Sequence, residues 1–212
     1  MSKITFSISE LIESAWYRFQ HRPLFWVCIV LLSISISSLG DYGLQFDSEN
    51  FDTSFNPLGL IMGILSLYIS ASITLMSVKY MRGQEVNFND ITAIGFNKFI
   101  HYVIAVIIST ILMVLGFLCF ILPGFYLMAR LMFVQYLVLD KDLSFGDAIN
   151  QSFQISKDDA LTLIGFMFAM FFIILIGLLC LVLGLLVAIP VSWLATAQLY
   201  LNYSKNINLS IE

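Results

Sequence analysis

The sequence predicts an all-α fold, a polytopic membrane bundle of six transmembrane helices arranged as three hairpins. The chain of 212 residues is 59% hydrophobic and only 11% charged, whereas soluble domains carry about 25% charged residues. So few charges cannot cover the surface of a soluble domain of this size. The apolar residues are also gathered into long segments, and a helix needs about 20 of them to cross roughly 30 Å of hydrocarbon.

The charges between the apolar segments predict the orientation of the bundle. Every lysine and arginine except Arg130 falls on one side of the segments, at Lys3, Arg18, Arg22, Lys79, Arg82, Lys98, Lys141, Lys157 and Lys205. The connector over residues 41–57 instead carries Asp41, Asp47, Glu49 and Asp52 and no base. The positive-inside rule then places both termini in the cytoplasm, and no cleavable leader is expected.

The first two spans are predicted directly from hydropathy. Leu24–Leu39 is slightly short, but it extends back to Phe19 if Arg22 reaches the interface. Its alternating serines look like a strand, yet a lone strand in lipid would leave its backbone unpaired, so a helix is expected. The second span is Leu58–Val78.

Two longer runs must fold back. Phe99–Leu139 would be about 60 Å long as one helix, twice the thickness of the bilayer. Pro123-Gly124 is its turn signal, giving spans Phe99–Leu122 and Phe125–Leu139. The run Leu161–Tyr200 has its reversal at Gly184 and Pro190. Six spans result.

An internal repeat accompanies the spans. Residues 1–212 form one membrane domain, with weak repeats over 6–78, 86–139 and 143–203. Each repeat begins with an apolar residue, an acid two positions on and an aromatic six further, at Ile8, Glu10 and Trp16, at Phe88, Asp90 and Phe96, and at Phe145, Asp147 and Phe153. An acid in the first turn of a helix is favoured by the helix dipole. We therefore predict an amphipathic interfacial helix before each hairpin, used for pseudo-threefold packing.

Arg130 lies inside a predicted span, where a charge costs about 2.5–3.5 kcal/mol on insertion scales. No predicted span contains an Asp or Glu, and Gln135 is among the polar neighbours within reach. Arg130 is either a structural arginine bonded to carbonyls at the Pro123-Gly124 break, or a contact for a lipid phosphate or another anion. Arg130 and Gln135 are thus the candidate lipid-binding or ligand-binding residues.

Other motifs predict packing rather than chemistry. Gly59-x-x-x-Gly63 is typical of close helix approach, within the chain or between copies of it. The three cysteines lie in apolar segments and are expected to be buried hydrophobes. His21 and His101 lack neighbouring ligands, so no metal or cofactor is expected. A net charge of −4 does not suit a nucleic-acid partner.

Part of the sequence resembles a known family. Leu122-Pro123-Gly124, Arg130, the run Leu137–Lys141, Ala148, Ser152 and Ser156 resemble the YciC-like family of uncharacterised bacterial inner-membrane proteins. The pattern is also similar to the membrane domain fused to some glycerophosphodiester phosphodiesterases. The resemblance implies six spans in a bacterial inner membrane and no established activity. It transfers no catalytic residues.

The sequence leaves the activity open. We expect a non-enzymatic inner-membrane protein of unknown activity that contacts membrane lipids, partner proteins or further copies of itself in envelope homeostasis. The alternative is a small transporter or channel for an anionic or lipid-like substrate. A lipid-modifying enzyme would have to use the cytoplasmic acids Asp140, Asp142, Asp158 and Asp159. The sequence contains no P-loop, nucleophile elbow or H-E-x-x-H motif.

Overall fold

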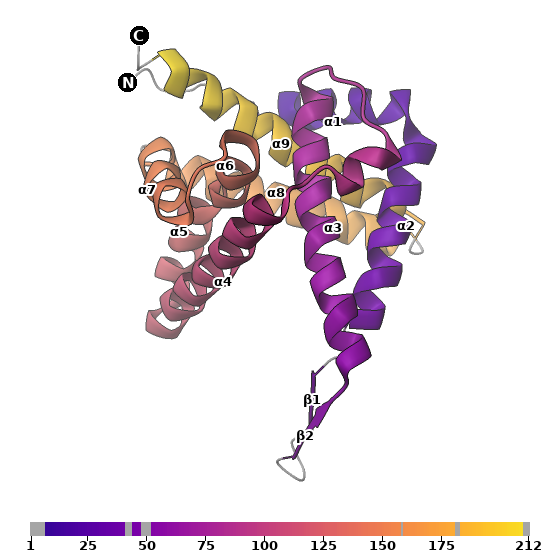
Figure 1. Cartoon of the computed structure of the whole chain (residues 1–212). Coiled ribbons are helices and arrows are strands. Elements are labelled where there is room, and N and C mark those ends of the chain that lie inside the picture. The colour runs from indigo at the N-terminus through magenta and orange to yellow at the C-terminus, as the bar shows by residue number, and fades with distance from the viewer. Residues whose placement is uncertain (1–6, 41–43, 48–51, 158, 181–182, 210–212) are drawn as a thin grey trace.

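Helices make up nearly all of the computed structural model, which describes residues 7–40, 44–47, 52–157, 159–180 and 183–209. The elements in chain order (Figure 1) are α1 Ile8–His21, α2 Pro23–Gly40, β1 Leu44–Asp47, β2 Asp52–Phe55, α3 Pro57–Met81, the 3-10 helix η1 Phe88–Thr92, α4 Phe96–Cys119, α5 Ile121–Leu131, α6 Val134–Lys141, α7 Phe145–Ile155, α8 Ala160–Leu179 and α9 Leu185–Leu209. The all-α bundle is confirmed. A short antiparallel hairpin, β1–β2, is added in the acidic connector.

The number of spans agrees with the prediction. Five helical stretches are long and apolar enough to cross a membrane unaided, namely α3, α4, the α5–α6 pair, α8 and α9. A sixth is counted if the pair α1 and α2, bent by 98° at their junction, contributes one crossing. Arg22 sits at the bend with non-helical angles (φ −143°, ψ 58°). Pro23 then begins α2, because its missing N–H would have no partner in a first turn anyway.

The three predicted hairpins are present, since α2 packs on α3, α4 on α5 and α8 on α9. The predicted position of the turn in the second hairpin, at Pro123-Gly124, is wrong. The chain turns at Phe120, in extended conformation (φ −169°, ψ 159°), and α5 begins at Ile121. Pro123 and Gly124 therefore belong to the first turn of α5, where a proline loses no intrahelical hydrogen bond. In the last hairpin Gly184 lies in the turn as predicted, but Pro190 is inside α9.

Two of the three predicted amphipathic helices are present. In α1 the buried residues Leu11, Ala15 and Phe19 recur every fourth position, as on an amphipathic helix. The third predicted helix is α7. The second is replaced by η1, only five residues long. In η1 the backbone N–H of Asn87 donates to the carboxylate of Asp90 at 2.8 Å, and the ion pair of Asp90 with Lys79 (3.1 Å) ties this short element to α3. The predicted span Phe125–Leu139 is also not one continuous helix. A turn at Met132 and Phe133 separates α5 from α6.

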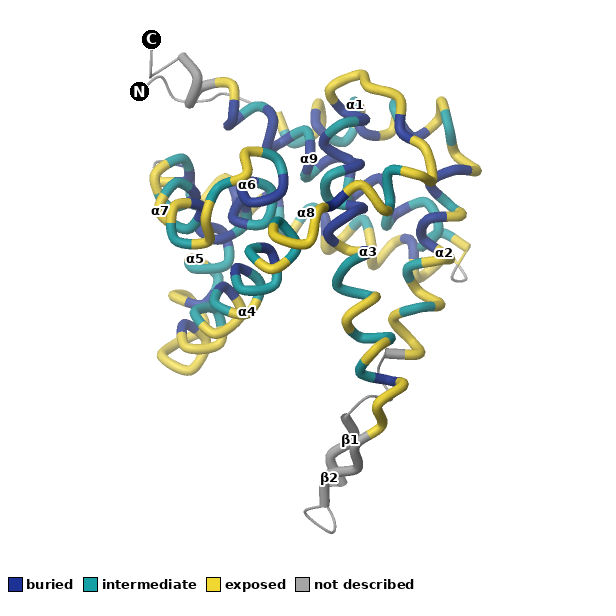
Figure 2. Tube along the Cα trace, viewed as in Figure 1, coloured by how far each residue is buried: buried dark blue, intermediate teal, exposed yellow. Residues whose placement is uncertain are grey.

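The helices gather around α9, which contacts α1, α2, α3 and α8. Its residues Leu194, Ala195, Ala197, Leu199 and Tyr200 are fully buried. Figure 2 shows buried positions where the helices converge and exposed ones at the hairpin tips. The tips of α2–α3 and α4–α5 point away from each other (Figure 1).

The exposed surface of the helices is apolar, as lipid-facing surfaces are. Leu118, Leu122 and Leu179 are among the exposed leucines near the tips. The three cysteines are exposed too, so the expectation that they are buried is wrong. Their surroundings would be hydrocarbon rather than protein.

Glycines permit the closest contacts of two hairpins. A Cβ atom at Gly124 would overlap the ring of Phe117, and one at Gly116 would lie 3.1 Å from Cα of Gly124. In the last hairpin a Cβ atom at Gly184 would lie 2.5 Å from the carbonyl oxygen of Gly177.

At Gly63 the close approach predicted for the Gly59-x-x-x-Gly63 motif is not seen among the described residues. Gly59 is buried, but a Cβ atom at Gly63 would meet nothing within 4 Å among the described residues. The glycines that allow close helix approach therefore lie in the second and third hairpins, next to their turns.

Replacing Gly124 and Gly63 by alanine should have different effects on stability. Gly124→Ala should lower the free energy of unfolding in detergent by about 1–3 kcal/mol, because the added methyl overpacks the contact with Phe117. Gly63→Ala should change it by at most about 1 kcal/mol, and in the stabilising direction, because alanine is the better helix former. Thermal unfolding followed by circular dichroism measures both. Equal losses in the two variants would contradict the packing of the hairpin.

Candidate functional site

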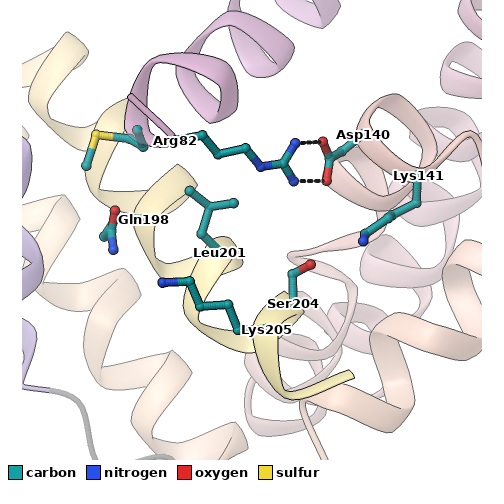
Figure 3. A pocket seen from close by; sticks show the side chains of 8 residues that line it. Arg82, Asp140, Lys141, Gln198, Leu201, Ser204 and Lys205 are labelled. Carbon is teal, nitrogen blue, oxygen red and sulfur yellow. Dashed lines mark hydrogen bonds and ion pairs between the residues drawn. The ribbon is translucent and has the colours of Figure 1, made fainter. Parts of the chain in front are cut away.

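The last helix of each hairpin ends near the same place. Arg82 follows α3, Asp140 and Lys141 end α6, and Ser204 and Lys205 lie near the end of α9. Together with Met81, Gln198 and Leu201 they line a cavity of about 500 Å³ (Figure 3). We call this cavity the basic pocket, and the end of the bundle that carries it the basic end. One base follows each of the three predicted repeats and lines the pocket.

A carboxylate joins the three hairpins beside the pocket. Both oxygens of Asp140 accept from Arg82, Oδ1 from Nη1 and Oδ2 from Nη2, each at 2.5 Å. Oδ2 also accepts from the hydroxyl of Tyr200 at 2.7 Å. The side chain of Asp140 is only 3% exposed, against 36% for Arg82. Hydrogen bonding to Asp140 raises the pKa of Arg82 above its ordinary value, so this guanidinium stays charged.

Aromatic rings hold Tyr200 in position for this contact. Tyr136 stacks on it with ring centroids 5.2 Å apart, and Phe133 lies 6.3 Å away. Phe133 and Tyr200 are both fully buried. The hydroxyl that donates to Asp140 is therefore fixed by packing, and ring pairs of this kind add stability beyond the area they bury.

Two lysines of the pocket are left without a carboxylate. Lys141 and Lys205 are exposed, and neither forms an ion pair within the described part of the chain. Lys98, by contrast, lies 2.6 Å from Asp142. The residues lining the pocket include three bases and one acid, which leaves a net charge of +2. The acid is already fully engaged, so the pocket is suited to an anion.

Arg130 is buried away from this pocket, with 7% of its surface exposed. Its guanidinium lies over the rings of Tyr126 (5.5 Å) and Phe153 (5.0 Å), which attract a cation. Its Nε and Nη1 atoms have no hydrogen-bond partner among the described residues. The expected bonds to carbonyls at the helix break are therefore not made, and rings take their place.

The rest of the predicted Arg130 site is not assembled. Gln135 is half-buried in α6. Both it and Arg130 lie in the described part of the chain, and no hydrogen bond joins them there. The backbone carbonyl of Arg130 instead accepts from the hydroxyl of Ser152 at 2.6 Å. Arg130 thus docks α7 onto α5 through its main chain and through Phe153.

Sequence reasoning missed the contact of Arg82, Asp140 and Tyr200. The sequence suggests for Asp140 either a solvated acid on a loop or an acid of a lipid-modifying enzyme, but its side chain is buried in an ion pair. The sequence does contain a pattern that indicates this cluster. A charged residue follows the last apolar segment of each repeat, in Met81-Arg82, Asp140-Lys141 and Ser204-Lys205. Within the described ranges no three His, Cys, Asp or Glu side chains come together in a way that could hold a metal ion.

Comparison with known proteins found no matching family model, no matching curated protein and no matching solved structure. The resemblance to the YciC-like family therefore stays a prediction based on the motifs quoted above.

The ion pair predicts a difference between two neighbouring aspartates. Asp140→Asn should lower the free energy of unfolding by about 2 kcal/mol, between the values of roughly 0.2–1 for exposed pairs and 3–5 for buried ones. Asp142→Asn should cost less than about 1 kcal/mol, because that side chain is 68% exposed and asparagine tolerates its left-handed backbone (φ 55°). Chemical unfolding in detergent compares the two. A larger loss for Asp142→Asn would count against the inferred role of Asp140.

Substitutions of Arg130 and Arg82 should have different effects on the free energy of unfolding in the same assay. Arg130→Met removes a buried charge with unpartnered N–H groups and should leave the free energy of unfolding unchanged or raise it by about 1 kcal/mol. Arg82→Met should lower it, because Asp140 would be left buried without its cation. If Arg130→Met proved as damaging as Arg82→Met, Arg130 would have to be a principal structural contact.

Proposed function

We propose that this chain is a non-enzymatic, multi-pass protein of a bacterial inner membrane that binds anionic lipid headgroups at its basic end, as part of maintaining the envelope. The observation that carries the proposal is the basic pocket, a cavity of about 500 Å³ with two lysines that have no carboxylate partner among the described residues. In this proposal the basic end faces the cytoplasm, in keeping with the positive-inside rule.

The position of the pocket favours a lipid as the source of the anion. It lies at the ends of α3, α6 and α9, where apolar helices give way to charged residues. Lysine stems can lie along apolar surface while the ammonium groups reach the headgroup layer. A lipid phosphate can accept charge-assisted hydrogen bonds from Lys141 and Lys205, which are stronger than bonds between neutral groups. Ser204 and Gln198 add polar groups to the same wall.

The transporter alternative is supported by a different observation. The ion pair of Arg82 with Asp140 joins the hairpins at the basic end, while the tips of two hairpins diverge (Figure 1). A carrier with this architecture would have to open the ion pair during its cycle. Flux of an anionic substrate into proteoliposomes that ceased in Arg82→Met would favour transport over static lipid binding.

Lipid retention tests the proposal. In native mass spectrometry, wild-type protein should retain phosphatidylglycerol in preference to phosphatidylcholine. The double variant Lys141→Gln/Lys205→Gln should bind the anionic lipid at least about tenfold more weakly, because charge-assisted bonds contribute roughly 1.5–3 kcal/mol each. Lys157→Gln is the matched control, since Lys157 is an exposed lysine outside the pocket.

Two results would count against the proposal. Unchanged phosphatidylglycerol binding by the double lysine variant would show that the basic pocket is not the site. An equal loss in Lys157→Gln would show that total charge, and not the pocket, determines lipid retention.

A further inference from the structure

A second cavity, of about 360 Å³, lies at the bend between α1 and α2. It is lined by Arg18, His21 and Arg22, by Tyr80 near the end of α3, and by the following residues 83–85. It shares no residue with the basic pocket. What it binds is therefore a separate question from the function proposed above.

The two arginines of this cavity are held in place by neutral groups. Nη1 of Arg22 donates to the carbonyl of Val86 at 2.7 Å, and its guanidinium lies 5.0 Å from the ring of Phe25. Arg18 lies 6.0 Å from the ring of Tyr80, whose hydroxyl donates to the Arg18 carbonyl at 2.9 Å. Both side chains are half-buried.

Gly83 lets the chain pass close to Arg18. It has a positive φ of 88°, which side chains rarely adopt, and a Cβ atom placed there would lie 3.6 Å from Nη2 of Arg18. The connector after α3 therefore passes within van der Waals distance of this guanidinium, next to the cavity.

No carboxylate of the described residues forms an ion pair with these two arginines. Arg18 in α1 and Arg22 just after its end line the same cavity, and two positive charges there repel each other. Neither forms an ion pair within the described ranges, and Glu85, the acid in the lining, forms none there either. His21 Nδ1 is engaged with the carbonyl of Tyr17 at 2.8 Å. Within the described ranges, two guanidinium groups thus face a cavity in which no ion pair neutralises them.

The chemistry of the pair points to a phosphate group. A planar guanidinium presents parallel N–H groups that match two phosphate oxygens, and a tetrahedral phosphate can accept from both arginines at once. An anion there would also relieve the repulsion between the arginines, which Glu85 does not. We infer that Arg18 and Arg22 hold the phosphate group of a lipid headgroup at the α1–α2 bend.

The surroundings of the cavity support a lipid as the source of that phosphate. Helix α1 is amphipathic and leaves the apolar α2 at 98°, the geometry of a helix lying along a membrane surface. Trp16 and Tyr17 on α1 are exposed, and such residues are enriched at the level of the headgroups. The bend therefore lies at the depth of lipid phosphates.

Counting bound lipids tests this inference apart from the basic pocket. With phosphatidylglycerol added, native mass spectrometry of the wild type should show two tightly retained lipids. Arg18→Gln/Arg22→Gln should retain one, Lys141→Gln/Lys205→Gln one, and the quadruple variant none. The single variant Arg18→Gln keeps the contact of Arg22 with Val86, and should weaken this site about tenfold even if the double variant folds poorly. Lys157→Gln controls for the loss of one charge.

The outcomes separate the two proposals. Loss of a lipid in the lysine variant with none in either arginine variant would overturn this inference and leave the proposed function standing. Loss only in the arginine variants would support this site and overturn the basic pocket. Inorganic phosphate at millimolar concentration should not displace the lipid from the Lys141→Gln/Lys205→Gln variant. If it did, the site would take free phosphate, and the assignment to a lipid would be wrong.

Discussion

The buried carboxylate of Asp140 is the contact on which the arrangement of the hairpins depends. It receives hydrogen bonds from Arg82, which follows the first hairpin, and from Tyr200 in the third, while it belongs to the second. In lipid there is little hydrophobic drive for helices to associate, so close packing and polar contacts determine which helices meet. Within a hairpin, glycines such as Gly116 and Gly124 allow the two helices to pack closely. Between hairpins, the hydrogen bonds of Asp140 join one helix to another.

The same contact determines the charge of the basic end. Because Asp140 is engaged by Arg82 and Tyr200, it cannot neutralise Lys141 or Lys205, and the pocket keeps its excess of bases. The cavity at the Arg22 bend has a smaller excess, two arginines against Glu85, and both arginines are held by rings and carbonyls. In our two proposals, anionic headgroups would supply the negative charge that both cavities lack.

Arg130 and the glycine motif show why single positions mislead when only the sequence is available. The cost of a charge inside a span is visible in the sequence, but its compensation comes partly from Phe153 on α7, which only folding brings near. Gly59-x-x-x-Gly63 matches a known pattern, yet Gly63 faces open space in the described structure. The glycines that do pack closely face each other across turns, where no fixed spacing within one helix reveals them.

The sequence by itself determined the helical class, the hairpins, the side on which the bases lie, and the amphipathic helices α1 and α7, because these follow from local hydropathy and periodicity. It could not determine which bases are neutralised. That depends on where the ends of helices distant in the chain converge, and on which of several nearby acids becomes buried. Only the tertiary structure paired Asp140 with Arg82 and left Lys141, Lys205, Arg18 and Arg22 without a carboxylate among the described residues.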